Sequence, residues 1–155
     1  MREAGCECGA PSECLNVWHE ALAAEQRDRA MYAWHTPLVC AFYLQHRSMY
    51  QPRSADGQYR LLQLFVDRGI GAVHAVARGR VARNHGSKPA LSTAELARYE
   101  GLPARSFPAV FGASVHVLRE KGGGFVSQGH TAYEDRMRSW AQATIDGWKV
   151  APRVC

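Results

Sequence analysis

Hydrophobic residues recur at intervals of three and four along most of the chain, which is the spacing of one face of an α-helix. No run of alternating β-branched residues bounded by tight-turn dipeptides interrupts this pattern. The clearest case is the segment from about 131 to 149, whose core-facing positions are Tyr133, Met137, Trp140, Ala141, Thr144, Ile145 and Trp148. The sequence therefore predicts an all-α protein that folds as one compact helical bundle.

Residues that favour the start or the end of a helix predict four more helices nearer the N-terminus. The first is expected from Ser12 or Glu13 to about Asp28, and the second from Thr36 through the almost wholly apolar run that ends near residue 46. A third is expected from Ser54 to Gly69 and a fourth over about 71–84. The predicted core stripe of the first helix, with its border, is Leu15, Val17, Trp18, Ala21, Leu22 and Glu25.

The stretch from about 85 to 113 breaks the helical pattern. It contains Pro89, Pro103 and Pro108 and is expected to be a long irregular loop, apart from one short helix with a capping box at residues 92–95. Another short helix is expected over 114–119, and Gly122-Gly123-Gly124 is expected to be a hinge or turn. Because loops of this length seldom persist without a role, the 85–113 segment is a candidate lid or partner loop.

Composition supports one globular domain over residues 1–155, in which 1–14 form an arm and 15–84 with 114–149 form the bundle. Hydrophobic residues make up 46% and charged residues 21%, as in ordinary globular proteins. No apolar run is long enough to cross a membrane or to act as a secretory signal, so we expect a cytoplasmic protein. The net charge of +5 comes from widely spread basic residues, which does not favour a nucleic-acid partner.

Three of the five cysteines fall within nine residues, at Cys6, Cys8 and Cys14. In a reducing compartment, thiolates this close together more often bind metal than form disulfides, and zinc suits them best. Gly9 after Cys8 is typical of a zinc knuckle, in which backbone amides turn towards a thiolate sulfur. The sequence therefore predicts a zinc knuckle at the amino-terminal arm.

Tetrahedral zinc needs a fourth ligand, and the candidates are His19, His35, His46 and Cys40. His19 is expected to point in a different direction from Cys14 on the same helix, and Cys40 is expected to be a small core residue. His35 lies where the chain reverses into the second helix and could return to the arm. We therefore expect Cys6, Cys8, Cys14 and His35 to bind the ion.

Several short motifs occur in a distinctive order: Cys6-Glu7-Cys8-Gly9-Ala10, then Cys14, His35, Gln45-His46, Asp67-Arg68-Gly69, and Arg138-Ser139-Trp140-Ala141 with Trp148. Their arrangement resembles a family of small bacterial proteins classed as domain of unknown function 5946. The resemblance covers most of the chain and is weakest over residues 85–108. It implies a compact helical protein with Cys and His positions at Cys6, Cys8, Cys14, His35 and His46, with Gln45 beside the last, and it implies no established activity.

Two positions depart from the family pattern. The first cysteine pair is usually Cys-x-x-Cys, whereas here it is the tighter Cys6-x-Cys8. Cys40 stands where an acidic residue is common in the family. A carboxylate that could serve a catalytic metal is therefore missing at that position.

Three thiolates and one imidazole fill the coordination tetrahedron and leave no position for water, so the predicted ion is structural. We expect an accessory or binding protein whose small-molecule or protein partner the sequence does not identify. The alternative is a metal-dependent or histidine-based enzyme acting on a small molecule at an interior polar site. That site would contain Tyr43, His46 and His116, beside Arg60 or Arg136. Motifs of the common enzyme classes are absent from the sequence.

Overall fold

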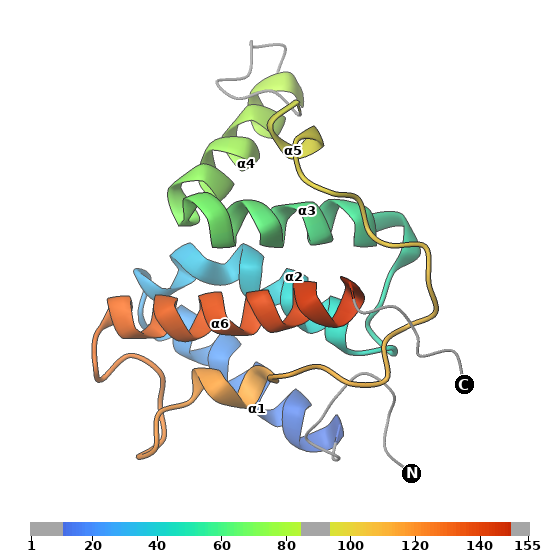
Figure 1. Ribbon diagram of the computed structural model, residues 1–155. Helices are drawn as coiled ribbons and strands as arrows, with labels where there is room; N and C mark the ends of the chain where they lie inside the picture. The colour runs from blue at the N-terminus through green and yellow to red at the C-terminus, as the bar shows by residue number, and fades with distance from the viewer. Residues whose placement is uncertain (1–10, 85–93, 150–155) are drawn as a thin grey trace.

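The computed structural model describes residues 11–84 and 94–149, and every regular element within these ranges is helical (Figure 1). The long helices are α1 (Pro11–Arg27), α2 (His35–Gln45), α3 (Pro52–Arg68), α4 (Ile70–Asn84) and α6 (His130–Lys149). Three short elements join them: η1 (Met31–Trp34), α5 (Ala94–Ala97) and η2 (Val115–Leu118). The predicted all-α fold is thus confirmed for the described part of the chain.

The core lies where α2, α3 and α6 meet, and these three helices pack against one another. α2 is buried over most of its surface, as its apolar sequence predicts. The seven core positions predicted in α6 are all buried. One prediction for α1 is wrong: Leu15 is 38% exposed, because it lies beside the face of α1 that packs on the bundle.

The helix boundaries follow local chemistry, with two differences from the sequence prediction. Gly69 ends α3 with φ of 84°, a conformation in which a residue with a Cβ would be strained. At its other end α3 begins at Pro52 rather than after Ser54, because proline fits the first helical position, where no donor is lost. The turn η1 was not predicted, and it buries Met31 and Trp34.

Residues 98–114 form no helix or strand, yet hydrogen bonds fasten their first part to α3. The Asp56 carboxylate accepts from the backbone N–H of Leu102 at 2.9 Å, and the Arg60 guanidinium donates to the Tyr99 carbonyl. Gln63 donates to the carbonyl of Glu100 at 2.7 Å. Bonds to backbone groups fix the path of this segment, so we call its described part the strap across α3. The role of the 85–113 segment as a lid or partner loop stays a prediction.

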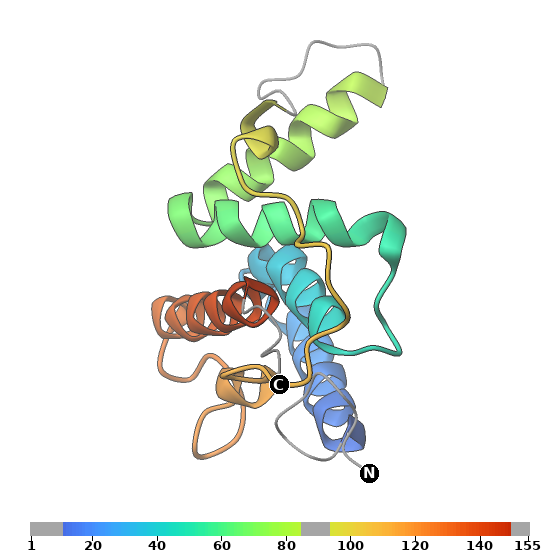
Figure 2. The ribbon, with the colours of Figure 1, turned by 45° about the vertical axis from the view of Figure 1, so that its right-hand side comes forward.

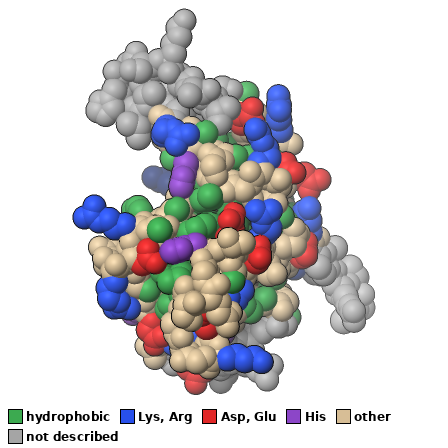
Figure 3. Space-filling view, turned by 90° about the vertical axis from the view of Figure 1, so that its left-hand side faces the viewer, with side chains coloured by type: hydrophobic (Ala, Val, Ile, Leu, Met, Phe, Trp, Pro, Cys, Tyr) green, Lys and Arg blue, Asp and Glu red, His purple; other side chains and the backbone are tan. Residues whose placement is uncertain are grey.

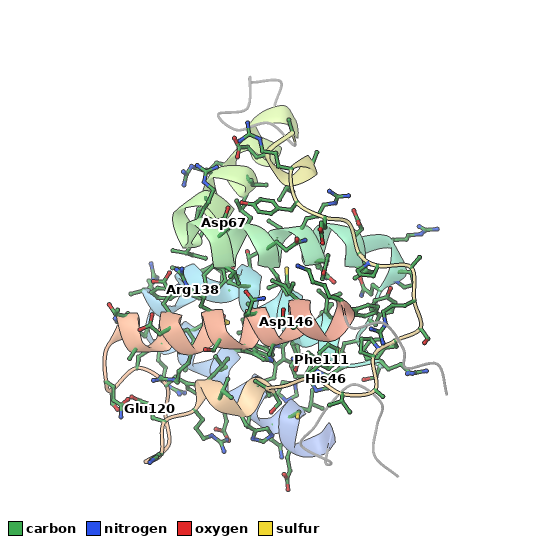
Figure 4. The ribbon with its side chains drawn as sticks, in the orientation of Figure 1. His46, Asp67, Phe111, Glu120, Arg138 and Asp146 are labelled. Atoms are coloured by element: carbon green, nitrogen blue, oxygen red, sulfur yellow. The ribbon has the colours of Figure 1, made fainter. Side chains whose placement is uncertain are left out.

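The turn at Gly122-Gly123-Gly124 is also fixed, by the buried carboxylate of Glu120 (Figure 4). It accepts hydrogen bonds from the Ser127 hydroxyl at 2.7 Å, the Ser127 N–H at 3.0 Å and the Gln128 N–H at 2.8 Å. The bond from Ser127 is the first cause of the lowered pKa of Glu120. This segment is therefore a structured turn and not a flexible hinge.

Candidate functional site

The buried amide of Gln45 is fully engaged in the core. Its Nε2 donates to the Ala113 carbonyl and to the Thr144 hydroxyl, both at 2.9 Å, and its Oε1 accepts from Trp140 Nε1 at 2.9 Å. These bonds join α2, α6 and the irregular segment that precedes η2. Because each hydrogen-bonding group of this amide has a partner, Gln45 holds the fold together and is not a candidate for chemistry.

A column of stacked rings joins α1 to the end of α2. The Trp18 ring lies 4.4 Å from the Phe42 ring at an interplanar angle of 7°, and the Phe42 ring lies 4.0 Å from the His46 ring. α1 and α2 run in opposite directions, as Figures 1 and 2 show, so the start of α1 lies at the same end of the pair as the end of α2. Figure 4 places His46 at this end of the molecule.

Cys14 lies at this end as well, one helical turn before Trp18 on the same face of α1. Its side chain is completely buried, and His46 is only 4% exposed. The ring of His46 is oriented by a 2.9 Å hydrogen bond between Nδ1 and the Phe42 carbonyl. Since a carbonyl only accepts, Nδ1 carries the proton and Nε2 carries the lone pair, which is the tautomer that a metal-binding histidine needs.

The other predicted ligands are placed differently. Cys6 and Cys8 lie outside the described residues, as does the predicted zinc knuckle. Within residues 11–84 and 94–149, no three His, Cys, Asp or Glu side chains are grouped so as to hold a metal ion. Cys40 is buried within α2, as predicted, and His19 is exposed on α1.

His35 lies at the far end of α1 from Cys14. Its Nδ1 is 2.7 Å from Oε2 of Glu25, which is eleven residues beyond Cys14 and therefore about 16 Å further along the helix axis. The described structure thus brings Cys14 to the end where His46 lies and does not bring it to His35. The sequence alone does not show which of these two histidines lies near Cys14, because that depends on how α1 and α2 are arranged in space.

The predicted interior site is only partly assembled. Tyr43 is half-buried with its ring 6.2 Å from that of Trp18, so Tyr43 lies beside the ring column that includes His46. His116 lies on η2, and its buried Nε2 has no hydrogen-bond partner among the described residues. The two arginines suggested for this site act elsewhere: Arg60 binds the strap, and Arg136 donates to the carbonyls of Leu118 and Phe125.

Sequence reasoning placed Glu25 only at the border of a core stripe, and the structure shows it as the most deeply buried carboxylate described. Its side chain is 1% exposed, and burial raises its pKa while the hydrogen bond and charge of His35 oppose the shift. Its second oxygen, Oε1, is buried without a hydrogen-bond partner among the described residues. The signal that could have found it was an acid at a helical core position in α1.

Over the described residues the fold defines a class, that of small all-helical proteins. Comparison with known families is more specific. The chain belongs to the family of unknown function DUF5946, whose model matches residues 3–149. No curated protein and no solved structure matches it. Across residues 11–84 and 94–149, none of the helices combines the length and hydrophobicity that crossing a bilayer demands.

Proposed function

We propose that the protein is a zinc-binding helical protein whose ion is structural, and that it acts as an accessory or binding protein. The proposed ligands are Cys6, Cys8, Cys14 and one histidine. His46 replaces His35 as that histidine, because it lies at the end of the helix pair where α1 begins. The single observation that carries the proposal is that a buried Cys14 lies at the same end of the helix pair as a His46 ring whose Nδ1 is committed to a carbonyl.

With a Cys3His ligand set, the ion would cross-link two parts of the chain. It would tie the arm that precedes α1 to the end of α2, across the ring column that already joins these helices. All four positions would be filled by protein, so no water would be bound for hydrolysis. Such an ion contributes to folding directly, because the unfolded chain does not hold its ligands together.

The ligand set is tested by metal analysis of the wild-type chain beside His46→Gln and His35→Gln. We expect one zinc per chain in the wild type and in His35→Gln, and weak binding in His46→Gln. Cobalt replacing zinc gives visible bands that report thiolate and imidazole ligands, and these bands should change only in His46→Gln. Zinc retained by His46→Gln and lost by His35→Gln would restore the original assignment.

The structural role is tested by chelation. Removing the ion should lower the melting temperature of the wild type and expose three thiols to titration, because the thiolates lose their shared charge partner. A Cys14→Ser variant should melt near the temperature of the chelated wild type. Three thiols that titrate freely in untreated protein, with no zinc present, would contradict the proposal.

A further inference from the structure

A second site, separate from the proposed zinc ligands, lies where α1 ends and η1 leads into α2. A groove of about 440 Å³ opens there, lined by Glu25, Gln26, Arg29 and Tyr32. His35 borders it through two contacts: its Nδ1 bonds Glu25, and its ring stacks on that of Tyr32 at 4.8 Å and 16°. Figure 3 shows histidine, acidic and hydrophobic side chains together on the face of the molecule that lies to the left in Figure 1.

The buried carboxylate of Glu25 fixes which nitrogen of His35 can act. In the neutral imidazole beside the ionised Glu25 carboxylate, Nδ1 donates its proton to Oε2, so Nε2 carries the lone pair. The imidazole side chain is 35% exposed, whereas the carboxylate is 1% exposed. Glu25 is therefore placed to orient His35 rather than to meet a ligand itself. The nitrogen that can accept a hydrogen bond from a ligand is Nε2 of His35, the more exposed of the two side chains.

The burial of Glu25 is poorly compensated by the rest of the fold. Oε1 of Glu25 is buried without a hydrogen-bond partner among the described residues, and the same is true of the Tyr133 hydroxyl. The pKa of Tyr133 is raised first by burial and then by the charge of Glu25. A carboxylate retained in the core with one hydrogen bond costs stability. Such groups are found more often where a site uses them, which favours a functional Glu25–His35 pair.

The groove also offers one cation. Arg29 is exposed and, among the described residues, forms no ion pair with a carboxylate. A guanidinium matches two oxygens of a phosphate or carboxylate group. A ligand that satisfies both Arg29 and the lone pair of His35 combines charged oxygens with a hydrogen-bond donor, and hydrogen phosphate (HPO₄²⁻) combines the two in one ion.

We propose that this groove binds a phosphate group, with Arg29 holding its charged oxygens and Nε2 of His35 accepting a hydrogen bond from its P–O–H. Glu25 is the positioning residue that selects the tautomer of His35. The phosphate proposal does not depend on the proposed zinc ion, because the described zinc ligand candidate on α1, Cys14, lies at the other end of that helix.

The test compares inorganic phosphate with sulfate at pH 8 and constant ionic strength. Both ions are then mainly dianions of the same shape, but only phosphate keeps a proton. The readout is the Nε2 resonance of His35 in the full chain labelled with ¹⁵N-histidine, with exposed His19 as the internal reference. We expect phosphate to shift His35 with an affinity about tenfold higher than sulfate, the value of one hydrogen bond to a charged group.

Two variants separate the roles. Arg29→Gln, at an exposed position, should fold normally and lose binding of both ions. Glu25→Gln can turn its amide to donate to Nδ1, which releases the proton to Nε2; the preference for phosphate over sulfate should then disappear. Equal shifts with both ions in the wild type, shifts that survive in Arg29→Gln, or equal shifts at His19 would overturn the proposal.

Discussion

At the scale of single residues, the backbone of Gly147 in α6 packs closely against the buried ring of Phe111. A Cβ at position 147 would lie 2.3 Å from Cδ1 and 2.7 Å from Cε1 of that ring. Gly147→Ala is therefore expected to lower the free energy of unfolding by about 1–3 kcal/mol, even though alanine is the better helix former. Urea unfolding measures the difference.

Gly57 provides the matched control, because it also lies inside a helix but nothing would lie within 4 Å of its Cβ. Gly57→Ala should raise the free energy of unfolding by up to about 1 kcal/mol through helix propensity alone. If both variants were stabilised, the Phe111 ring could not occupy the position described.

Gly147→Ala adds volume to the core, whereas a substitution at Gln45 can keep the volume of the side chain and remove its polar groups. Gln45→Met would leave Trp140 Nε1 and the Ala113 carbonyl without their buried partner. We expect a loss of about 2–4 kcal/mol, since each orphaned group costs about 1–3 kcal/mol. Gln142→Met, which removes an exposed bond to Asp146, should change stability by less than about 0.5 kcal/mol. Equal effects would argue against the buried network.

At the scale of elements, the strap over α3 depends on side chains that one face of that helix presents at successive turns. Arg60→Met removes the Nη1 group, which donates to the Tyr99 carbonyl in the strap and to the Leu96 carbonyl in α5. We expect faster hydrogen exchange at the Leu102 amide and earlier proteolytic cleavage within residues 98–106, while the core of α6 stays protected. Arg53→Met, on an exposed part of the same helix, should alter neither. Unchanged exchange in Arg60→Met would mean that other contacts hold the strap.

Elements differ in how well the sequence predicted them, and the reason is the range of the interaction. The spacing of hydrophobic residues predicted every buried position in α6, because periodicity reports directly which face of a helix is buried. The bond between Asp56 and Leu102 joins residues 46 apart, and no local pattern encodes it. The fourth ligand of the predicted metal site depends on the same kind of long-range information, because a choice between His35 and His46 requires the antiparallel arrangement of α1 and α2.

At the scale of the whole molecule, four described carboxyl groups with shifted pKa values divide into two sets with opposite effects on stability. Asp28, Asp56 and Glu120 have lowered pKa values, caused first by hydrogen bonds from His130, the Leu102 backbone and Ser127 respectively. Each stabilises the fold above its unfolded pKa, near 3.8 for Asp and 4.5 for Glu, and loses that contribution as pH falls through the folded value. Glu25 has a raised pKa, so protonation favours the folded state, and its contribution is lost as pH rises through the folded value.

The two sets predict opposite differences between variants as pH changes. Asp56→Asn keeps an oxygen that Leu102 can bond, so its deficit against the wild type should be full at pH 7 and should shrink as pH falls below about 4. Glu25→Gln removes a buried charge, so relative to the wild type it should be most stable at pH 7 and should lose that advantage on acidification through the raised pKa of Glu25. Urea unfolding of the three proteins from pH 7 to pH 3 measures both trends. Parallel profiles for wild type and Glu25→Gln would show that Glu25 ionises as it does in the unfolded chain, and that its burial beside His35 is not what sets its charge.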